Sequence, residues 1–162
     1  MKSLRDTHLP HIFLKPGELF LSRDPAIVST VLGSCVSITF FEPVARLGAM
    51  CHVMLPSGPM HEGFRYVDST LGYMVEKIGG MGIRLAVCEV KMFGGADVLL
   101  PRELLGSKLS IGCQNILEAQ RGLDLLGLVP KASDVGGKHG RKLFFNSHTG
   151  DVFLKKVQKT HF

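Results

Sequence analysis

The sequence predicts an α+β domain in which mixed or antiparallel sheets pack between helices. Many short apolar segments rich in β-branched residues follow one another, and only two stretches carry clear helical spacing. The two kinds of segment do not alternate strictly, which argues against a parallel α/β sheet. Because the 162 residues contain no repeat and no long linker, we interpret residues 1–162 as a single domain.

Apolar segments in the first third of the chain predict strands. Glu18–Ser22 alternates between polar and apolar residues, and Ala26–Leu32 is apolar and β-branched. Gly33-Ser34 interrupts this run, and a second β-rich run, Cys35–Phe41, follows at once. The third apolar run, Arg46–Pro56, ends at a proline.

Two stretches have the spacing of helices. The first covers Tyr66–Ile78, follows a loop over residues 57–65, and is predicted to stop at Gly79-Gly80. The second begins after Ser110, a residue suited to cap a helix, and runs to about residue 126 with a glycine after it. Its predicted inner side carries Ile116, Leu117, Leu123 and Leu126.

The remaining apolar segments predict further strands. Residues 83–93 form one β-rich run that Gly94-Gly95 ends. Residues 128–136, 142–146 and 151–157 predict three more strands, and residues 146–151 between the last two have the composition of a hairpin turn.

Bulk composition excludes several classes of protein. Hydrophobic residues make up 45% of the chain and charged residues 20%, which is typical of a globular protein and not of a disordered one. No apolar run approaches the length of a membrane span, and the first residues lack the pattern of a signal peptide. We therefore expect a cytoplasmic protein that does not insert into membranes.

The four cysteines are predicted to be free thiols. None belongs to a CxxC pair, so the usual zinc spacing is missing, and neither a metal nor a cofactor is expected. Cys51, Cys88 and Cys113 are interpreted as core residues.

The excess positive charge lies entirely in the second half. Residues 1–81 hold 7 basic and 7 acidic residues, whereas residues 82–162 hold 12 and 7, which gives the whole net charge of +5. Such a balance favours an anionic partner, or is a solvated basic surface. Nucleic acid is not the expected partner, because no basic run is interleaved with aromatic residues.

Cys35 is the first candidate for chemistry. It follows Gly33-Ser34, and a glycine in such a turn permits unusual backbone angles and close approach of a substrate. A cysteine in this place is either a small core residue or a nucleophile, and a nucleophile needs a base or a positive neighbour to form its thiolate.

His52 is the candidate base. It lies 17 positions after Cys35 inside an apolar segment, where a histidine needs a partner. Two paired strands would bring both residues together as a Cys–His couple. The alternative is a core histidine with a satisfied ring. A third residue would orient the imidazole, and Ser29 and Thr30 are the candidates, of which strand alternation lets only one face the site.

Two glycine pairs, Gly94-Gly95 and Gly136-Gly137, follow predicted strands. Each is interpreted either as backbone along which a peptide substrate approaches or as a plain turn. Neither resembles a phosphate-binding loop.

These residues and their neighbours together resemble the CheD family, the chemoreceptor glutamine deamidases of bacterial chemotaxis. The resemblance runs from about Lys15 to Val157. It rests on PGELFLS, STVLGSCVSI, EPVARLGAMCHVMLP, VKMFGGADV, IGCQNI and SDVGGKHGRKLFFNSHTGDV. The most specific part is LGSC followed by HxMLP at the Cys–His separation of 17.

The resemblance implies a fold similar to the deamidase domain of cytotoxic necrotizing toxins. It also implies a catalytic Cys, His and upstream hydroxyl residue, which here are Cys35, His52 and Thr30, with Ser29 as the alternative for the third. Backbone around Gly33 and Ser34 would hold the oxyanion, and Gly94 and Gly95 would lie along the substrate.

The activity implied is hydrolysis of receptor glutamines to glutamate through a Cys35 thioester, without a cofactor. Methyl-accepting chemoreceptors would be the substrate, and the basic second half would steer the protein to their acidic surface. A CheC-type phosphatase is a further partner that the resemblance suggests. The competing hypotheses are a regulatory adaptor with slow chemistry and a cysteine hydrolase of small amides.

Overall fold

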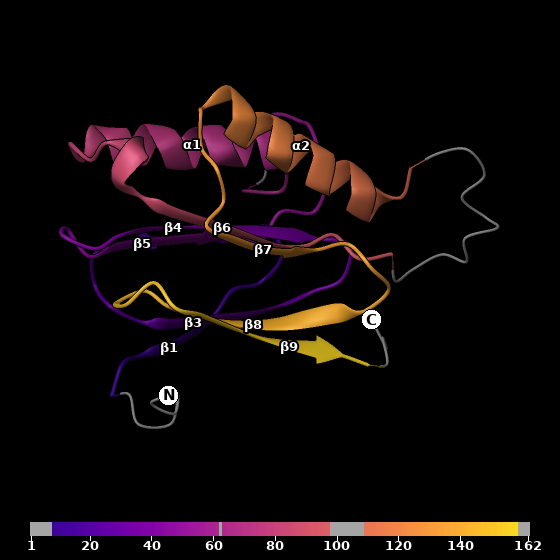
Figure 1. Cartoon of the computed structure of the whole chain (residues 1–162), viewed down its shortest axis with the longest axis horizontal. Helices are drawn as coiled ribbons and strands as arrows, with labels where there is room; N and C mark the ends of the chain where they lie inside the picture. The colour runs from indigo at the N-terminus through magenta and orange to yellow at the C-terminus, as the bar shows by residue number, and fades with distance from the viewer. Residues whose placement is uncertain (1–7, 62, 98–108, 159–162) are drawn as a thin grey trace.

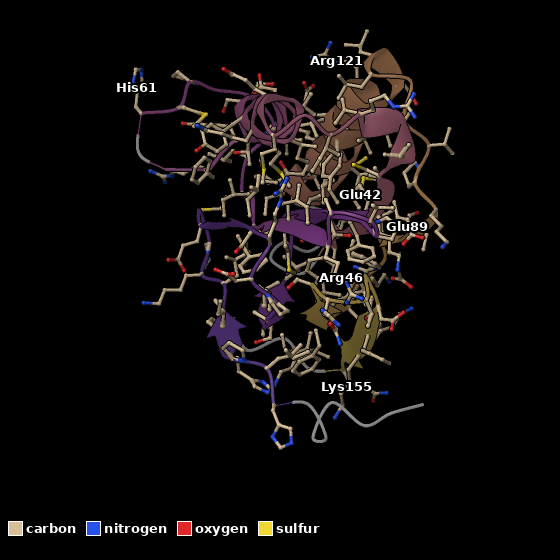
Figure 2. All side chains as sticks on the ribbon, turned by 90° about the vertical axis from the view of Figure 1, so that its left-hand side faces the viewer. Glu42, Arg46, His61, Glu89, Arg121 and Lys155 are labelled. Carbon is tan, nitrogen blue, oxygen red and sulfur yellow. The ribbon has the colours of Figure 1, made fainter. Side chains whose placement is uncertain are left out.

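In the computed structural model, which describes residues 8–61, 63–97 and 109–158, the chain forms three stacked layers (Figure 1). A layer of two helices covers one face of a five-stranded sheet, and a four-stranded sheet covers the other face. Figure 2 shows the same order from the side, with Arg121 beside the helices at the top and Lys155 of the four-stranded sheet near the bottom. The predicted α/β mixture is confirmed.

Both sheets are mixed, as predicted. The five-stranded sheet has the order β2 (Leu19–Ser22), β5 (Leu47–Cys51), β4 (Val36–Glu42), β6 (Glu89–Gly94) and β7 (Ala132–Val135), and only the β6–β7 pair is parallel. The four-stranded sheet has the order β1 (His11–Phe13), β3 (Ile27–Leu32), β8 (Gly140–Asn146) and β9 (Val152–Val157), and only the β1–β3 pair is parallel. The predicted hairpin joins β8 to β9.

Strand β4 explains why the layers hold together. All seven of its residues are buried, and alternate side chains enter two different hydrophobic cores. Val36, Ile38 and Phe40 pack under the helices, while Phe41 packs between the two sheets. A strand buried on both faces reads as a continuous apolar run, which is what the sequence shows here.

Helix packing differs from the sequence prediction in one respect. Helices α1 (Val67–Gly80) and α2 (Ile111–Leu125) lie together on the same side of the sheets, so the sheets are not enclosed between helix layers. The physical reason is that the two sheets bury one apolar face each against the other. Only the five-stranded sheet then has a second apolar face for helices to cover.

The ends of both helices refine the prediction. Helix α1 continues through Gly79-Gly80, and the left-handed residue that ends it is Gly82, with φ of 78°. Ser110 caps α2 as predicted, because its Oγ accepts the Cys113 N–H at 3.1 Å.

The inner side of α2 was predicted incorrectly in part. Leu123 is buried, but Leu117 and Leu126 are 49% and 38% exposed. The buried stripe of the helix instead consists of Gly112, Asn115, Ala119 and Leu123. Small residues let the helix approach the sheet closely, and this sets its rotation.

The predicted strand over residues 83–93 is shorter in the structure. Its first part forms a 3-10 turn, Leu85–Val87, and the strand proper is β6. The chain must first turn back from the end of α1 before it can enter the sheet, and this turn uses the residues before Glu89.

Candidate functional site

The turn Gly33-Ser34-Cys35 connects the two sheets. Strand β3 of the four-stranded sheet ends at Leu32, and β4 of the five-stranded sheet begins at Val36. Cys35 is half-buried and packs against the core between the sheets. The predicted nucleophile therefore lies where the chain crosses from one sheet to the other.

Each carbonyl of this turn is held by a hydrogen bond. The Ala96 N–H donates to Gly33 O at 3.0 Å, and the Gly95 N–H donates to Cys35 O at 2.8 Å. The Asn115 side chain donates to Ser34 O at 3.0 Å. Three successive acceptors are thus fixed from outside the turn.

The amide N–H groups of the same three residues differ from their carbonyls. Within the described residues, none of the N–H groups of Gly33, Ser34 and Cys35 donates a hydrogen bond. All three residues are only partly buried, so a substrate can reach them. Neighbouring free N–H groups at a turn form a site for an anion or a developing oxyanion.

Gly94 and Gly95 pack against the main chain of Cys35 in this turn. Their φ angles are 107° and 72°, which favour glycine, and a Cβ on Gly94 would collide with Cys35 O. The Gly95 N–H is already bonded to Cys35 O and is not available to a substrate. The structure thus gives this pair a supporting role, and its approach to a substrate stays a prediction.

His52 lies one residue beyond the end of β5 and is buried at 2% exposure. Its Nδ1 is 2.7 Å from Thr30 Oγ1, and Thr30 Oγ1 is also 2.7 Å from Leu14 O. A carbonyl only accepts, so the single hydroxyl proton of Thr30 goes to Leu14 O. Thr30 Oγ1 must then accept from His52 Nδ1–H, which leaves His52 Nε2 as a bare acceptor.

Thr30 and Ser29 lie on opposite faces of β3. Thr30 is fully buried and faces the core between the sheets with His52, whereas Ser29 is half-buried on the other face. The main-chain carbonyl of Ser29 accepts the Leu14 N–H at 2.8 Å. Strand alternation thus separates the two candidates as expected, and Thr30 is the one that contacts the imidazole.

Strand register places Cys35 and His52 on the same face. An isolated bridge pairs Val36 with Val53, in step with the β4–β5 ladder, so Cys35 and His52 are diagonal neighbours across the two strands. In the part of the chain that the structure describes, no hydrogen bond joins the Cys35 thiol to the imidazole. The resting site holds the two groups close without a formed pair.

Burial keeps both groups neutral at rest. It raises the pKa of the Cys35 thiol to about 11 and lowers the pKa of His52 to about 4. These shifts favour a neutral thiol and a neutral imidazole over a thiolate–imidazolium ion pair. An imidazole in this state is ready to accept a proton.

The other cysteines divide as burial dictates. Cys51, next to His52 in sequence, faces the helices, is 1% exposed and belongs to the core beneath them, as predicted. Its pKa is raised by burial to about 12. Cys88 is half-buried and packs against the same core, while Cys113 is half-buried on α2, so the core prediction is wrong for Cys113. All four are free thiols.

Two buried polar residues near the site were not identified from the sequence. Asn115 bonds Ser34 O, and Arg141, 3% exposed, donates to Asp134 at 2.7 Å and to Gly136 O at 2.8 Å. A signal for Asn115 existed, because it lies four residues before Ala119 on the buried stripe of α2. No comparable spacing marks Arg141, whose partners lie in β7 and in the turn directly after it.

Neither a metal centre nor a membrane span is found where the structure describes the chain. Residues 8–61, 63–97 and 109–158 contain no group of three or more His, Cys, Asp or Glu side chains able to hold a metal ion. No helix in these same ranges is long and apolar enough to cross a membrane.

Comparison with known proteins identifies relatives over almost the whole chain. A family model described as CheD chemotactic sensory transduction matches residues 54–156. A Geobacter sulfurreducens protein named probable chemoreceptor glutamine deamidase CheD 2 is 46% identical, with 96% of each chain covered. A Maridesulfovibrio salexigens protein named probable chemoreceptor glutamine deamidase CheD is 41% identical, with 93% of this chain and 94% of the relative covered. A Thermotoga maritima protein named chemoreceptor glutamine deamidase CheD is 33% identical, with 87% of this chain and 88% of the relative covered.

Proposed function

The chain belongs to the CheD family, and from this premise we propose that it is a hydrolase that deamidates glutamines of chemoreceptors. The names of the relatives support the activity and the substrate class. The observation that supports the chemistry is a thiol in a turn whose N–H groups have no partner among the described residues, diagonally across from an imidazole whose Nδ1 is held by Thr30.

The proposed reaction begins with proton transfer. His52 Nε2 takes the proton of Cys35 as the sulfur attacks the carboxamide carbon of the glutamine. Rotation of the Cys35 side chain closes the gap between the two groups, since such contacts often tighten only when substrate is bound. Thr30 holds the ring through Nδ1 and bonds the imidazolium that forms.

The tetrahedral intermediate places a negative oxygen beside the turn. N–H groups of Gly33, Ser34 and Cys35 are the donors proposed to stabilise it. The imidazolium of His52 then gives its proton to the leaving nitrogen, the C–N bond breaks, and ammonia departs. Water, deprotonated by His52, attacks the thioester; the C–S bond breaks, the product is glutamate, and Cys35 regains its proton.

The basic second half has a place in this proposal. Lys142 and Lys155 are exposed and lie opposite each other on β8 and β9, so their charges add on one surface. We expect this surface to steer the protein to acidic receptor segments. Association that weakens as salt rises supports this role, and association that is independent of salt contradicts it.

In this proposal residues 1–162 act as a single deamidase domain that works in the cytoplasm. The fold of this domain is proposed to be similar to the deamidase domain of cytotoxic necrotizing toxins. The substrate is proposed to approach along Gly94 and Gly95. A CheC-type phosphatase remains a proposed second partner, and a pure adaptor function is the alternative that the following experiment separates.

The test is mass spectrometry of a receptor cytoplasmic fragment incubated with the protein. Each conversion of glutamine to glutamate adds about one mass unit, because NH₂ is replaced by OH. We expect conversion with the parent chain, none with Cys35→Ala, and conversion with Cys51→Ala, whose thiol faces the helices. A parent chain that converts no glutamine in receptor fragments from the source cell contradicts the enzyme and favours the adaptor.

A further inference from the structure

Asn115 is a buried amide that joins the two halves of the proposed site. Its side chain is fully buried, and its two N–H groups donate to Ser34 O at 3.0 Å and to Met54 O at 3.1 Å. Ser34 directly precedes Cys35, and Met54 lies two residues after His52. One amide from α2 therefore holds the segment of the nucleophile and the segment of the base at the same time.

The bond to Ser34 also determines where a backbone N–H points. The C=O of Ser34 and the N–H of Cys35 belong to the same planar peptide unit, and in a trans unit they point in opposite directions. Because Asn115 holds the C=O toward α2, the N–H of Cys35 is directed away from the helix. That N–H is one of the free donors of the turn.

We infer that Asn115 is a positioning residue that orients the Ser34–Cys35 peptide so that its N–H binds the oxyanion of the reaction. The inference rests on the proposed deamidase function. Asn115 itself touches neither the substrate nor the reacting atoms in this role. It acts through the peptide unit that it holds, and through Met54 it fixes the spacing between that unit and the segment after β5 that carries His52.

Tight packing of α2 keeps the amide in place. A Cβ on Gly112 would lie 2.5 Å from Gly95 O and 2.6 Å from Ala96 O. The first turn of α2 therefore packs directly on Gly95 and Ala96, whose N–H groups bond the carbonyls of Cys35 and Gly33. Ser110 caps the same helical turn through the Cys113 N–H. Within the described residues Asn115 Oδ1 has no partner, so the two donors are the contacts that the side chain makes.

The test compares two reactions of Cys35 that differ in one requirement. Deamidation of a receptor cytoplasmic fragment develops an oxyanion, whereas alkylation of the thiol by iodoacetamide displaces iodide from a CH₂ group and develops none. The variant Asn115→Leu removes both donors at similar volume. We expect its kcat for deamidation to fall about 10- to 100-fold with little change in KM, as for a weakened oxyanion donor. The rate of Cys35 alkylation, measured by peptide mass spectrometry, should stay within about twofold of the parent rate, and its pH profile should be unchanged.

Two further variants complete the experiment. Asn115→Asp keeps the shape of the side chain and loses the amide donors, so its kcat for deamidation should also fall while its rate of alkylation is kept. This variant tests the inference if Asn115→Leu does not fold. Gln114→Leu is the matched control, because its amide bonds only Leu109 O at 2.9 Å in the described part of the chain, and it should retain the parent kcat.

Several outcomes overturn the inference. Parent-like kcat in Asn115→Leu would show that the amide does not orient a donor. Deamidation and alkylation that fall together, or the failure of both Asn115 variants to fold, would show that its role is purely structural. A parent chain that converts no glutamine would instead contradict the proposed function, and the inference with it.

Discussion

Strand β4 has a turn at each end, and the two turns use their backbone groups in opposite ways. At its far end, the hairpin Glu42–Arg46 leads into β5, and the buried Glu42 carboxylate accepts the N–H groups of Val44 and Ala45. At its near end, in Gly33-Ser34-Cys35, the carbonyls accept hydrogen bonds, while the N–H groups find no acceptor among the residues that the structure describes. One turn satisfies its donors and the other satisfies its acceptors.

This difference distinguishes a structural turn from the turn of Cys35, which is the proposed reactive turn. Buried or half-buried donors are normally paired, because an unpaired one lowers stability. The hairpin follows that rule with a carboxylate from its own sequence. In the described part of the chain the turn of Cys35 departs from this rule, because every carbonyl is bonded and the three N–H groups are left as rigid donors that a ligand can use.

The largest expected effect comes from Gly94→Ala, which removes the support of the reactive turn. A Cβ there collides with Cys35 O, and φ of 107° is strained for alanine, so we expect the free energy of unfolding to fall by roughly 3–5 kcal/mol. Gly127→Ala is the control, since φ of Gly127 is 70° but a Cβ added there would have no described non-neighbouring atom within 4 Å. This substitution should lower the free energy of unfolding by only about 1–2 kcal/mol. Chemical denaturation measures both, and equal losses would contradict a specific role for Gly94.

The second effect is a loss of stability at acidic pH. Burial lowers the pKa of His52 to about 4, against about 6.5 in the unfolded chain, so between these values the unfolded state binds more protons. The free energy of unfolding should therefore fall by roughly 3 kcal/mol as the pH drops from 6.5 to 4. His52→Gln should lack this contribution, which denaturation at several pH values would reveal. Parallel curves for parent and variant would rule it out.

The third effect separates Thr30 from Ser29. Thr30→Val keeps the shape of the side chain but removes the acceptor of His52 Nδ1–H, so the ring loses its fixed tautomer. We expect kcat for deamidation to fall about 10- to 100-fold with KM unchanged. Ser29→Ala, on the other face of β3, should stay within about twofold. The reverse ranking in steady-state kinetics would assign the role to Ser29.

The smallest effect belongs to the structural turn. Glu42→Gln replaces one acceptor oxygen with an NH₂ group that faces a backbone N–H, and it removes the charge from the remaining bond. We expect a loss of about 1–2 kcal/mol in the free energy of unfolding and no change in kcat. A change in kcat at temperatures where the variant is folded would show that the two ends of β4 are coupled.

Local patterns in the sequence were sufficient for most of the elements and for the turn that carries Cys35. Alternation and β-branched runs located the strands other than β1, whose three exposed residues carry no such pattern. Ser110 located the start of α2, and the break at Gly33-Ser34 drew attention to Cys35. Strand parity also predicted that only one of Ser29 and Thr30 faces the imidazole. Each of these signals depends on residues that are neighbours in the chain.

What the sequence did not reveal depends on contacts between distant residues. The partner of Ser34 O lies on α2, and the rotation of that helix follows from the close approach of Gly112 to the loop after β6. The side of the sheets that the helices cover depends on how the two sheets bury each other. The tautomer of His52 follows from Leu14 O, which no spacing rule connects to it.

The bond from Asn115 to Ser34 spans 81 positions of sequence, and this has a consequence for biosynthesis. A nascent chain that has been translated as far as Val53 already contains Thr30, Cys35 and His52. It still lacks the loop after β6 and the helix α2, whose groups bond the carbonyls of Gly33, Ser34 and Cys35. Contacts between residues so far apart in sequence slow folding, because a long loop must close before they form. Translation therefore delivers the thiol of Cys35 early and the groups that orient its backbone late, so the proposed site can be complete only after α2 has been synthesised.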